Sequence, residues 1–110
     1  MRQIEVGVIG TGWCGGIRAE TLARHALVKA LHVAEIRPDR LEEIAQLTGA
    51  KTATEDWHAI ARHPALEAIY VSATPEATHY PMARECLAAG KHVFLEKPIA
   101  MELAQADELI

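Results

Sequence analysis

Residues 4 to 15, with the sequence IEVGVIGTGWCG, decide the fold of this chain. The apolar run Ile4–Ile9 predicts a mostly buried strand. The residues that follow it form a G-x-G-x-x-G pattern, Gly10-Thr11-Gly12-Trp13-Cys14-Gly15. A helix should come next, because a stripe at helical spacing is formed by Cys14, Ile17, Thr21 and Leu22. A glycine-rich turn between a strand and a helix is the context in which this pattern indicates phosphate binding.

Each glycine of the loop has its own predicted task. Gly10 permits the tight turn, Gly12 lets a pyrophosphate approach the backbone, and Gly15 lets the helix pack closely on the strand. The start of the helix adds free N–H groups and a partial positive charge for the phosphates. A glycine-rich turn without a ligand is the alternative. The candidate cofactor-binding loop comprises Gly10, Thr11, Gly12, Trp13, Cys14 and Gly15.

Strands and helices alternate along the rest of the chain. Further strands are predicted at residues 28–35, 51–53, 68–73 and 92–95. Helices are predicted at residues 38–48, after an N-cap at Asp56, at residues 80–89, and from residue 101 onward. This alternation is typical of a doubly wound parallel α/β sheet, for which we expect the strand order 3-2-1-4-5. Because the chain stops within a predicted helix, we expect the final strand of such a sheet to be missing.

An acidic residue ends the second predicted strand. Glu35 stands 20 residues after Gly15, where a carboxylate can accept hydrogen bonds from the ribose of a bound adenosine and repel a 2′-phosphate. Arg37 and Arg40 complicate this interpretation, since a guanidinium can hold a 2′-phosphate. We expect NAD as the cofactor, with NADP possible; an ordinary charged strand end is the alternative without a ligand.

Two later loops should reach the same edge of the sheet, because ligands bind beyond the carboxyl ends of parallel strands. They are residues 73–79, ATPEATH, and Glu96-Lys97-Pro98. Lys97 is the lysine of this edge, where it can hydrogen-bond a substrate hydroxyl and take part in proton transfer. From chemistry alone, a solvated surface lysine is an equal alternative.

Composition narrows the class of protein. The 110 residues are 50% hydrophobic and 24% charged, with a formal net charge of −4, which suits one folded domain. No basic patch for nucleic acid, no membrane-length apolar run and no signal peptide stand out. Two cysteines and the spacing of the histidines give no metal site. We therefore expect a cytoplasmic domain that binds neither nucleic acid, membrane nor metal.

Four segments resemble the glucose–fructose oxidoreductase, inositol dehydrogenase and rhizopine-catabolism (Gfo/Idh/MocA) family. They are GVIGTGWCG at 7–15, VAEIRPDR at 33–40, SATPEATH at 72–79 and AGKHVFLEKPIA at 89–100. The last is the most specific, because the family's E-K-P motif follows the fifth strand at this spacing. The resemblance extends over essentially the whole chain. It implies an NAD(P)-dependent oxidoreductase and identifies the chain with the family's N-terminal Rossmann domain.

The resemblance also assigns tasks to residues. It implies that the loop glycines bind pyrophosphate and that Glu35 binds the adenosine ribose, where the family usually has Asp. Thr74, Pro75 and His79 match the loop beside the nicotinamide half of the cofactor.

Lys97 matches the family's catalytic lysine, which contacts substrate and nicotinamide. Glu96 would orient this lysine, and the bond before Pro98 is often cis in relatives. Two positions depart from the family pattern: Glu76 replaces the usual Asn, which puts a direct cofactor contact there in doubt, and Arg18 replaces a frequent His.

Length is the larger departure. Members of the family carry a second α/β domain that supplies substrate specificity, the oligomer interface and usually a catalytic Asp or His. The resemblance therefore implies that residues 1–110 are an incomplete dinucleotide-binding domain, inactive by themselves. It also implies a homo-oligomer formed through the absent domain.

The leading hypothesis is the cofactor-binding portion of a dehydrogenase. It would transfer a hydride between nicotinamide and a secondary alcohol or ketone of a sugar, polyol or related small molecule. One alternative is a non-catalytic dinucleotide sensor or interaction module that docks through the apolar surface of the last helix. Another is a methyltransferase that binds S-adenosylmethionine, which would not need Lys97.

Overall fold

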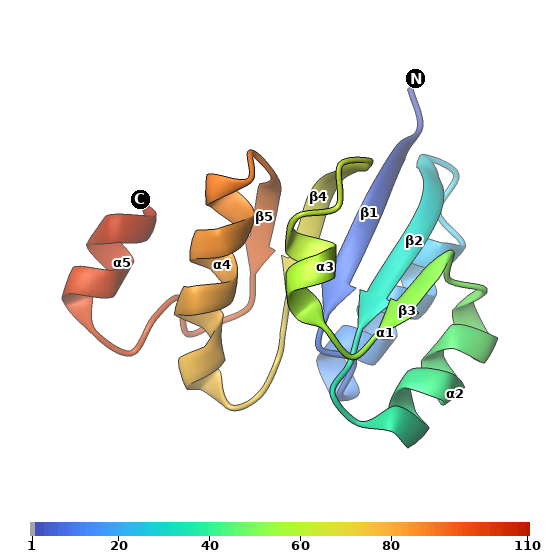
Figure 1. The fold of residues 1–110 in the computed structure, drawn as a ribbon, viewed down its shortest axis with the longest axis horizontal. Coiled ribbons are helices and arrows are strands. Elements are labelled where there is room, and N and C mark those ends of the chain that lie inside the picture. Colours follow the sequence, from blue (N-terminus) through green and yellow to red (C-terminus); the bar gives the residue numbers. More distant parts are fainter. Residues whose placement is uncertain (1) are drawn as a thin grey trace.

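One parallel sheet organises the molecule. The computed structural model describes residues 2–110, and its strands lie in the order β3-β2-β1-β4-β5 (Figure 1). This is the predicted order, and every neighbouring pair is parallel. The strands are β1 (Ile4–Ile9), β2 (Val28–Ala34), β3 (Thr52–Thr54), β4 (Leu66–Val71) and β5 (His92–Leu95).

Helices follow the strands as the sequence predicts. Local signals set their ends: Pro38 lies in the first turn of α2, Gly49 adopts a left-handed conformation after it (φ 66°), and the Asp56 side chain caps α3 by accepting from His58 N at 3.0 Å. A short 3₁₀ turn, Glu76–Thr78, precedes α4. The helices are α1 (Trp13–Ala23), α2 (Pro38–Thr48), α3 (Trp57–Ala61), α4 (His79–Ala88) and α5 (Leu103–Leu109).

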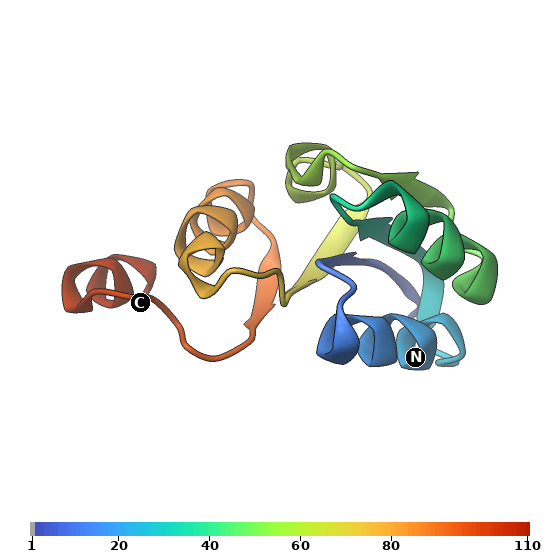
Figure 2. The same cartoon turned by 90° about the horizontal axis from the view of Figure 1, so that it is seen from below.

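Helices cover both faces of the central strands, whereas Phe94 of β5 is 62% exposed. Ala19 of α1 and Ile44 of α2 pack on one face, in a cluster that includes Val6, Val8 and Val33. On the other face, α3 and α4 pack through Ile60, Ala61, Met82 and Cys86. Figure 2 shows α1 below the sheet and α3 above it. Alternate side chains of one strand therefore pack against the helices on opposite faces of the sheet.

The predicted stripe of α1 is wrong at three of its four positions. Cys14 and Thr21 are exposed and Ile17 is 42% exposed, whereas the helix buries Gly15, Gly16 and Ala19. Small residues face the sheet because α1 starts directly above the glycine loop and has no room for larger ones. Helical spacing therefore located Leu22, which packs against the core cluster, but placed the other three residues on the wrong face.

The last two elements are the most open part of the fold. In α4 the predicted inward residue Leu87 is 42% exposed, while Cys86 is buried as expected. Helix α5 lies beyond α4 (Figure 1) and is tied to it by Arg84 Nε, which donates to Glu108 Oε1 at 2.7 Å. Leu103 and Ile110 stay exposed. None of the helices within residues 2–110 is long and apolar enough to cross a membrane.

Candidate functional site

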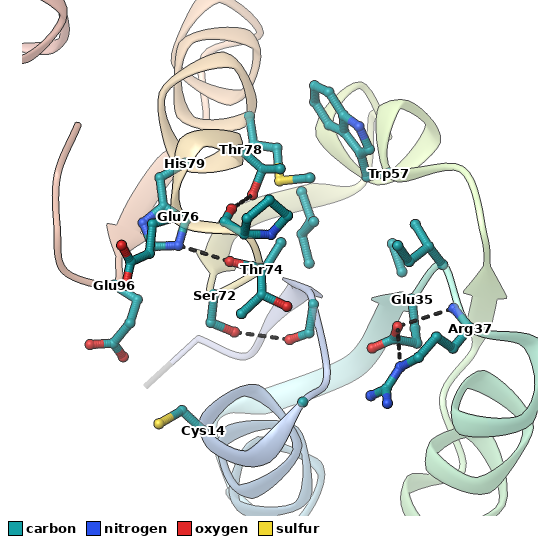
Figure 3. A pocket seen from close by; sticks show the side chains of 18 of the residues that line it. Cys14, Glu35, Arg37, Trp57, Ser72, Thr74, Glu76, Thr78, His79 and Glu96 are labelled. Carbon is teal, nitrogen blue, oxygen red and sulfur yellow. Dashed lines mark hydrogen bonds and ion pairs between the residues drawn. The ribbon is translucent and has the colours of Figure 1, made fainter. Parts of the chain in front are cut away.

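A cavity of about 670 Å³ opens at the carboxyl ends of the strands. Its walls come from the segments that follow all five strands, so the parallel sheet gathers residues far apart in sequence. Figure 3 shows Glu35 and Arg37 on one side of it, and Thr74, His79 and Glu96 on the other. This volume falls within the range of roughly 300–1,000 Å³ that is typical of small-molecule sites.

Two glycines of the loop are required by the backbone around them. Gly10 has a φ of +88°, and a Cβ there would lie 2.4 Å from the Cα of Ala73. A Cβ on Gly15 would lie 1.8 Å from the carbonyl oxygen of Gly10 and 2.4 Å from Ser72 Oγ. The predicted tasks of these two glycines, a tight turn and close helix packing, are confirmed.

Gly12 is different, because its space is open. A Cβ at this position would meet no described heavy atom within 4 Å, yet Gly12 lines the cavity. It is the N-cap of α1, and within residues 2–110 no side chain bonds to that helix end. The N–H groups of the first turn are therefore free for an anionic group that approaches over Gly12.

The Glu35 carboxylate lies at the end of β2 and is only 7% exposed. Its Oε1 accepts from Thr11 N at 2.9 Å and Thr11 Oγ1 at 2.8 Å, and its Oε2 accepts from Arg37 N at 3.1 Å. Burial would raise the pKa of Glu35, but the hydrogen bonds from Thr11 and Arg37 outweigh it and hold the pKa below its ordinary value. Glu35 therefore stays ionised at neutral pH.

The two arginines named with Glu35 have different positions. Arg37 lines the cavity, and its Nε lies 3.5 Å from Glu35 Oε2 with 60% of the side chain exposed. Arg40 is not among the cavity residues; its Nε donates to Thr11 O at 2.7 Å, and its guanidinium also pairs with Glu43. Arg37 is therefore the arginine that a ligand in this cavity would meet.

His79 joins the two loops on the other side of the cavity. Its ring is 2% exposed, with Nδ1 2.9 Å from Pro98 O and Nε2 2.9 Å from Ala73 O. The peptide bonds before Pro75 and Pro98 are both cis, the second as the resemblance implied. His79 thus lines the cavity while both ring nitrogens face backbone oxygens of the protein.

Glu96 and Lys97 follow β5 at the same rim. The Glu96 carboxylate accepts from the Tyr70 hydroxyl and from Lys97 N, the latter at 3.3 Å. The hydrogen bond from Tyr70 is the largest cause that holds the pKa of Glu96 below its ordinary value. Lys97 is exposed and lines the cavity. This rim therefore presents the oriented carboxylate of Glu96 and the ammonium group of Lys97, which has no side-chain partner among residues 2–110.

The structure brings most of the predicted site residues to one cavity. Thr11, Gly15 and Pro98 are the exceptions: Thr11 is fully buried, and none of the three lines the cavity. No group of three or more potential metal ligands occurs in the described part of the chain. The predicted residues that do line it are Gly10, Gly12, Trp13, Cys14, Glu35, Arg37, Thr74, Pro75, His79, Glu96 and Lys97.

Sequence reasoning missed several cavity residues. Ile36 and Trp57 add apolar surface near Glu35, and Ser72 holds the glycine loop by donating to Gly10 O at 2.9 Å. One signal was present for Ile36, a large apolar residue placed after the strand end and 67% exposed. No sequence signal pointed to Trp57 as a cavity residue, because its place at the start of a short helix predicted only packing.

An open parallel sheet with an uncapped glycine loop and a buried acid at the end of its second strand defines a dinucleotide-binding domain. The comparison with protein families agrees. A model of the oxidoreductase family with an NAD-binding Rossmann fold matches residues 4–110, and the chain belongs to this Gfo/Idh/MocA family. This membership favours the oxidoreductase hypothesis over the methyltransferase one.

Several relatives are described as dehydrogenases or reductases. The chain is 35% identical over 107 residues to a myo-inositol 2-dehydrogenase of Thermotoga maritima, covering 97% of this chain. It is similar to the scyllo-inositol dehydrogenase of Lactobacillus casei with bound NAD(H) and scyllo-inositol (27% identity, TM-score 0.88, 98% of this chain). It is also similar to a 3-ketoreductase of Actinomadura kijaniata in complex with TDP-benzene and NADP (31% identity, TM-score 0.84, 98% of this chain).

The match is confined to part of each relative. The chain spans 32% of the Thermotoga and Lactobacillus proteins and 34% of the Actinomadura protein. What these relatives share with the chain is therefore their cofactor-binding region.

Proposed function

We propose that this chain is the cofactor-binding part of an NAD(P)-dependent dehydrogenase. The whole enzyme would transfer a hydride between the nicotinamide and a secondary alcohol or ketone of a sugar, polyol or related small molecule. One observation carries the proposal: an uncapped glycine loop, a buried ionised acid and an exposed lysine surround a single cavity. The inositol substrates of the relatives support the substrate class.

The order of groups around the cavity supports one orientation of the dinucleotide. Glu35 would accept hydrogen bonds from the adenosine ribose. The backbone N–H groups in the first turn of α1, next to Gly12, would hold the pyrophosphate. The nicotinamide half would then extend toward Thr74, Glu96 and Lys97. When bound, the nicotinamide supplies or accepts the hydride.

NAD is the proposed cofactor, with NADP as the alternative. An ionised Glu35 would repel a 2′-phosphate, because two negative charges would meet in a partly buried site. Arg37 is the group that favours the alternative, since it is exposed beside Glu35. The relatives include proteins with NAD(H) and with NADP bound, so the preference must be measured.

Lys97 is the proposed catalytic residue. It would donate a hydrogen bond to the substrate oxygen and pass a proton at that atom, with Glu96 orienting the segment that carries it. In a preparation that turns over a polyol, Lys97→Met should lower kcat strongly, by a larger factor than it raises the dissociation constant of NAD. Retention of kcat would remove Lys97 from this role.

Calorimetric titration of the purified chain tests the proposal. We expect saturable binding of NAD⁺ and NADH, weaker binding of NADP⁺, and none of S-adenosylmethionine. Gly12→Val should abolish binding while circular dichroism shows an intact fold, because the side chain would fill the space over the loop. Ala26→Val, which places the same isopropyl side chain at an exposed position outside the cavity, serves as the control. Binding of S-adenosylmethionine alone would contradict the proposal.

Two wider expectations stay proposals. A homo-oligomer formed through a further domain is implied by the family resemblance. A cytoplasmic location is consistent with two free cysteines among the described residues.

A further inference from the structure

Thr11 occupies the glycine loop without reaching the cavity. Although Gly10 and Gly12 on either side both line the cavity, Thr11 is 0% exposed. Its amide N–H and its hydroxyl both donate to the same oxygen, Oε1 of Glu35, at 2.9 and 2.8 Å. The loop that would hold the pyrophosphate is thereby bonded directly to the acid that would hold the ribose.

These bonds restrict what the Glu35 carboxylate can do. A carboxylate offers about four lone-pair positions, and Oε1 uses both of its own on Thr11. Oε2 accepts from Arg37 N at 3.1 Å, and its other partner, Arg37 Nε, lies at 3.5 Å. The long contact to the exposed Arg37 side chain is the weakest of the four. Oε2 is therefore the oxygen at which a ribose hydroxyl can replace a protein donor.

We infer that Thr11 is a positioning residue for Glu35 and so determines how strongly the site prefers NAD over NADP. This inference rests on the proposed function. With Oε1 fixed by Thr11, the carboxylate cannot rotate away from the ribose, and its charge lies where a 2′-phosphate would come. Without the hydroxyl, only the Thr11 amide N–H still holds Oε1, so Glu35 can turn more easily and Arg37 becomes available to the phosphate.

Two substitutions separate the hydroxyl from the shape of the side chain. Thr11→Val keeps the branched shape and removes the hydroxyl, whereas Thr11→Ser keeps the hydroxyl. We expect Thr11→Val to lower the ratio of the NADP⁺ and NAD⁺ dissociation constants about tenfold, since hydrogen bonds to charged groups are among the stronger ones. Thr11→Ser should leave the ratio within about twofold of the unmodified chain.

A second readout follows the acid itself. The carboxyl pKa of Glu35, measured by NMR in the protein without cofactor, should rise in Thr11→Val and stay low in Thr11→Ser. The pH midpoint below which NAD⁺ binding is lost should move upward in the valine variant in the same way. A role in packing alone would shift neither value.

The outcomes are distinct. If the unmodified chain binds neither dinucleotide, the proposed function fails and this inference fails with it. If the chain binds NAD⁺ but Thr11→Val and Thr11→Ser have the same ratio and the same Glu35 pKa, only the role of Thr11 is overturned. Should the valine variant not fold, Thr11→Ala removes the hydroxyl without a branched side chain, and the same comparison with serine decides.

Discussion

The hydroxyl of Tyr70 in β4 donates a hydrogen bond to the carboxylate of Glu96, which follows β5. The Tyr70 ring is held in turn by Phe94, stacked at 4.9 Å, and by the Arg18 guanidinium, 5.9 Å above the ring centroid. Arg18, which departs from the family's frequent His, therefore has a structural consequence. It links α1 through Tyr70 to the rim that carries Lys97.

Tyr70→Phe should affect the nicotinamide half of the cofactor alone. The change removes the donor to Glu96 and leaves the ring in place, so we expect NAD⁺ binding to weaken about three- to tenfold. ADP-ribose, which lacks nicotinamide, should bind as before in the same calorimetric titration. Tyr80→Phe is the matched control, because the Tyr80 hydroxyl also donates to a glutamate, Glu108, outside the cavity. Equal losses for NAD⁺ and ADP-ribose would contradict this prediction.

Gly15→Ala should destabilise the fold. The new Cβ would lie 1.8 Å from a backbone oxygen, which forces α1 away from β1, so we expect a loss of at least about 3 kcal/mol. Gly12→Ala should cost less than about 1 kcal/mol, because its φ is −63° and its space is open. Urea unfolding followed by circular dichroism measures both. Similar losses at the two positions would show that the loop does not pack on β1 as described.

These glycines also show how far sequence reasoning reached. The tight turn at Gly10 and the close packing at Gly15 could be predicted, because both follow from one motif in one strand–turn–helix context. The strand order could be predicted from alternation and resemblance. The inward face of α1 could not, since Ile17 satisfies helical spacing as well as Ala19 does. Only the close approach of the helix to the loop decides between them.

In the candidate cofactor site, too, some features could be predicted from the sequence and others could not. The cavity position of Glu35 and Lys97 follows from strand ends, which sequence can locate. The burial of Thr11 and the bridge made by His79 depend on how the loops after β1, β4 and β5 lie against one another. Neighbours across a parallel sheet are distant in sequence, so no local pattern signals such contacts.

The two cysteines should differ in reactivity. Cys14 is exposed and lines the cavity, whereas Cys86 is buried and burial raises its pKa to about 12. We expect iodoacetamide to modify only Cys14 in the folded chain. NAD⁺ at ten times its dissociation constant should slow that reaction about tenfold, by occupying the site. Mass spectrometry locates the adduct, and unfolding in urea should expose both thiols. An unchanged rate with NAD⁺ bound would place the cofactor away from Cys14.

Two neighbouring histidines, the buried His32 and the half-buried His63, should make stability depend on pH. The fully buried His32 donates through Nε2 to Glu5 Oε1 at 2.8 Å, and its ring centroid lies 4.6 Å from that of His63. Its Nδ1 has no hydrogen-bond partner among the described residues. Burial, and then the neighbouring His32, lower the pKa of His63, while the hydrogen bond to His32 is the main cause that lowers the pKa of Glu5.

The lowered pKa values of His63 and Glu5 both make the folded chain less stable as the pH falls. Because the pKa of His63 is lower in the folded state, protons bind the unfolded chain first, and stability should fall as the pH drops from about 7 through the unfolded value near 6.5. Glu5 adds a second loss at lower pH, because its stabilising contribution is present above the unfolded pKa and disappears as the pH falls through the folded one. Chemical unfolding between pH 4 and 8 should show both steps.

His63→Asn should remove the first step and leave the second. The amide can still accept from Ala65 N, as His63 Nδ1 does at 3.2 Å, but it does not titrate. His25→Asn is the matched control, because His25 Nδ1 accepts from Leu27 N at 3.1 Å in the same kind of turn and is exposed. That variant should keep both steps. If His63→Asn retains the loss of stability between about pH 7 and 6, the titrating group is not His63, and its buried neighbour His32 becomes the residue to replace.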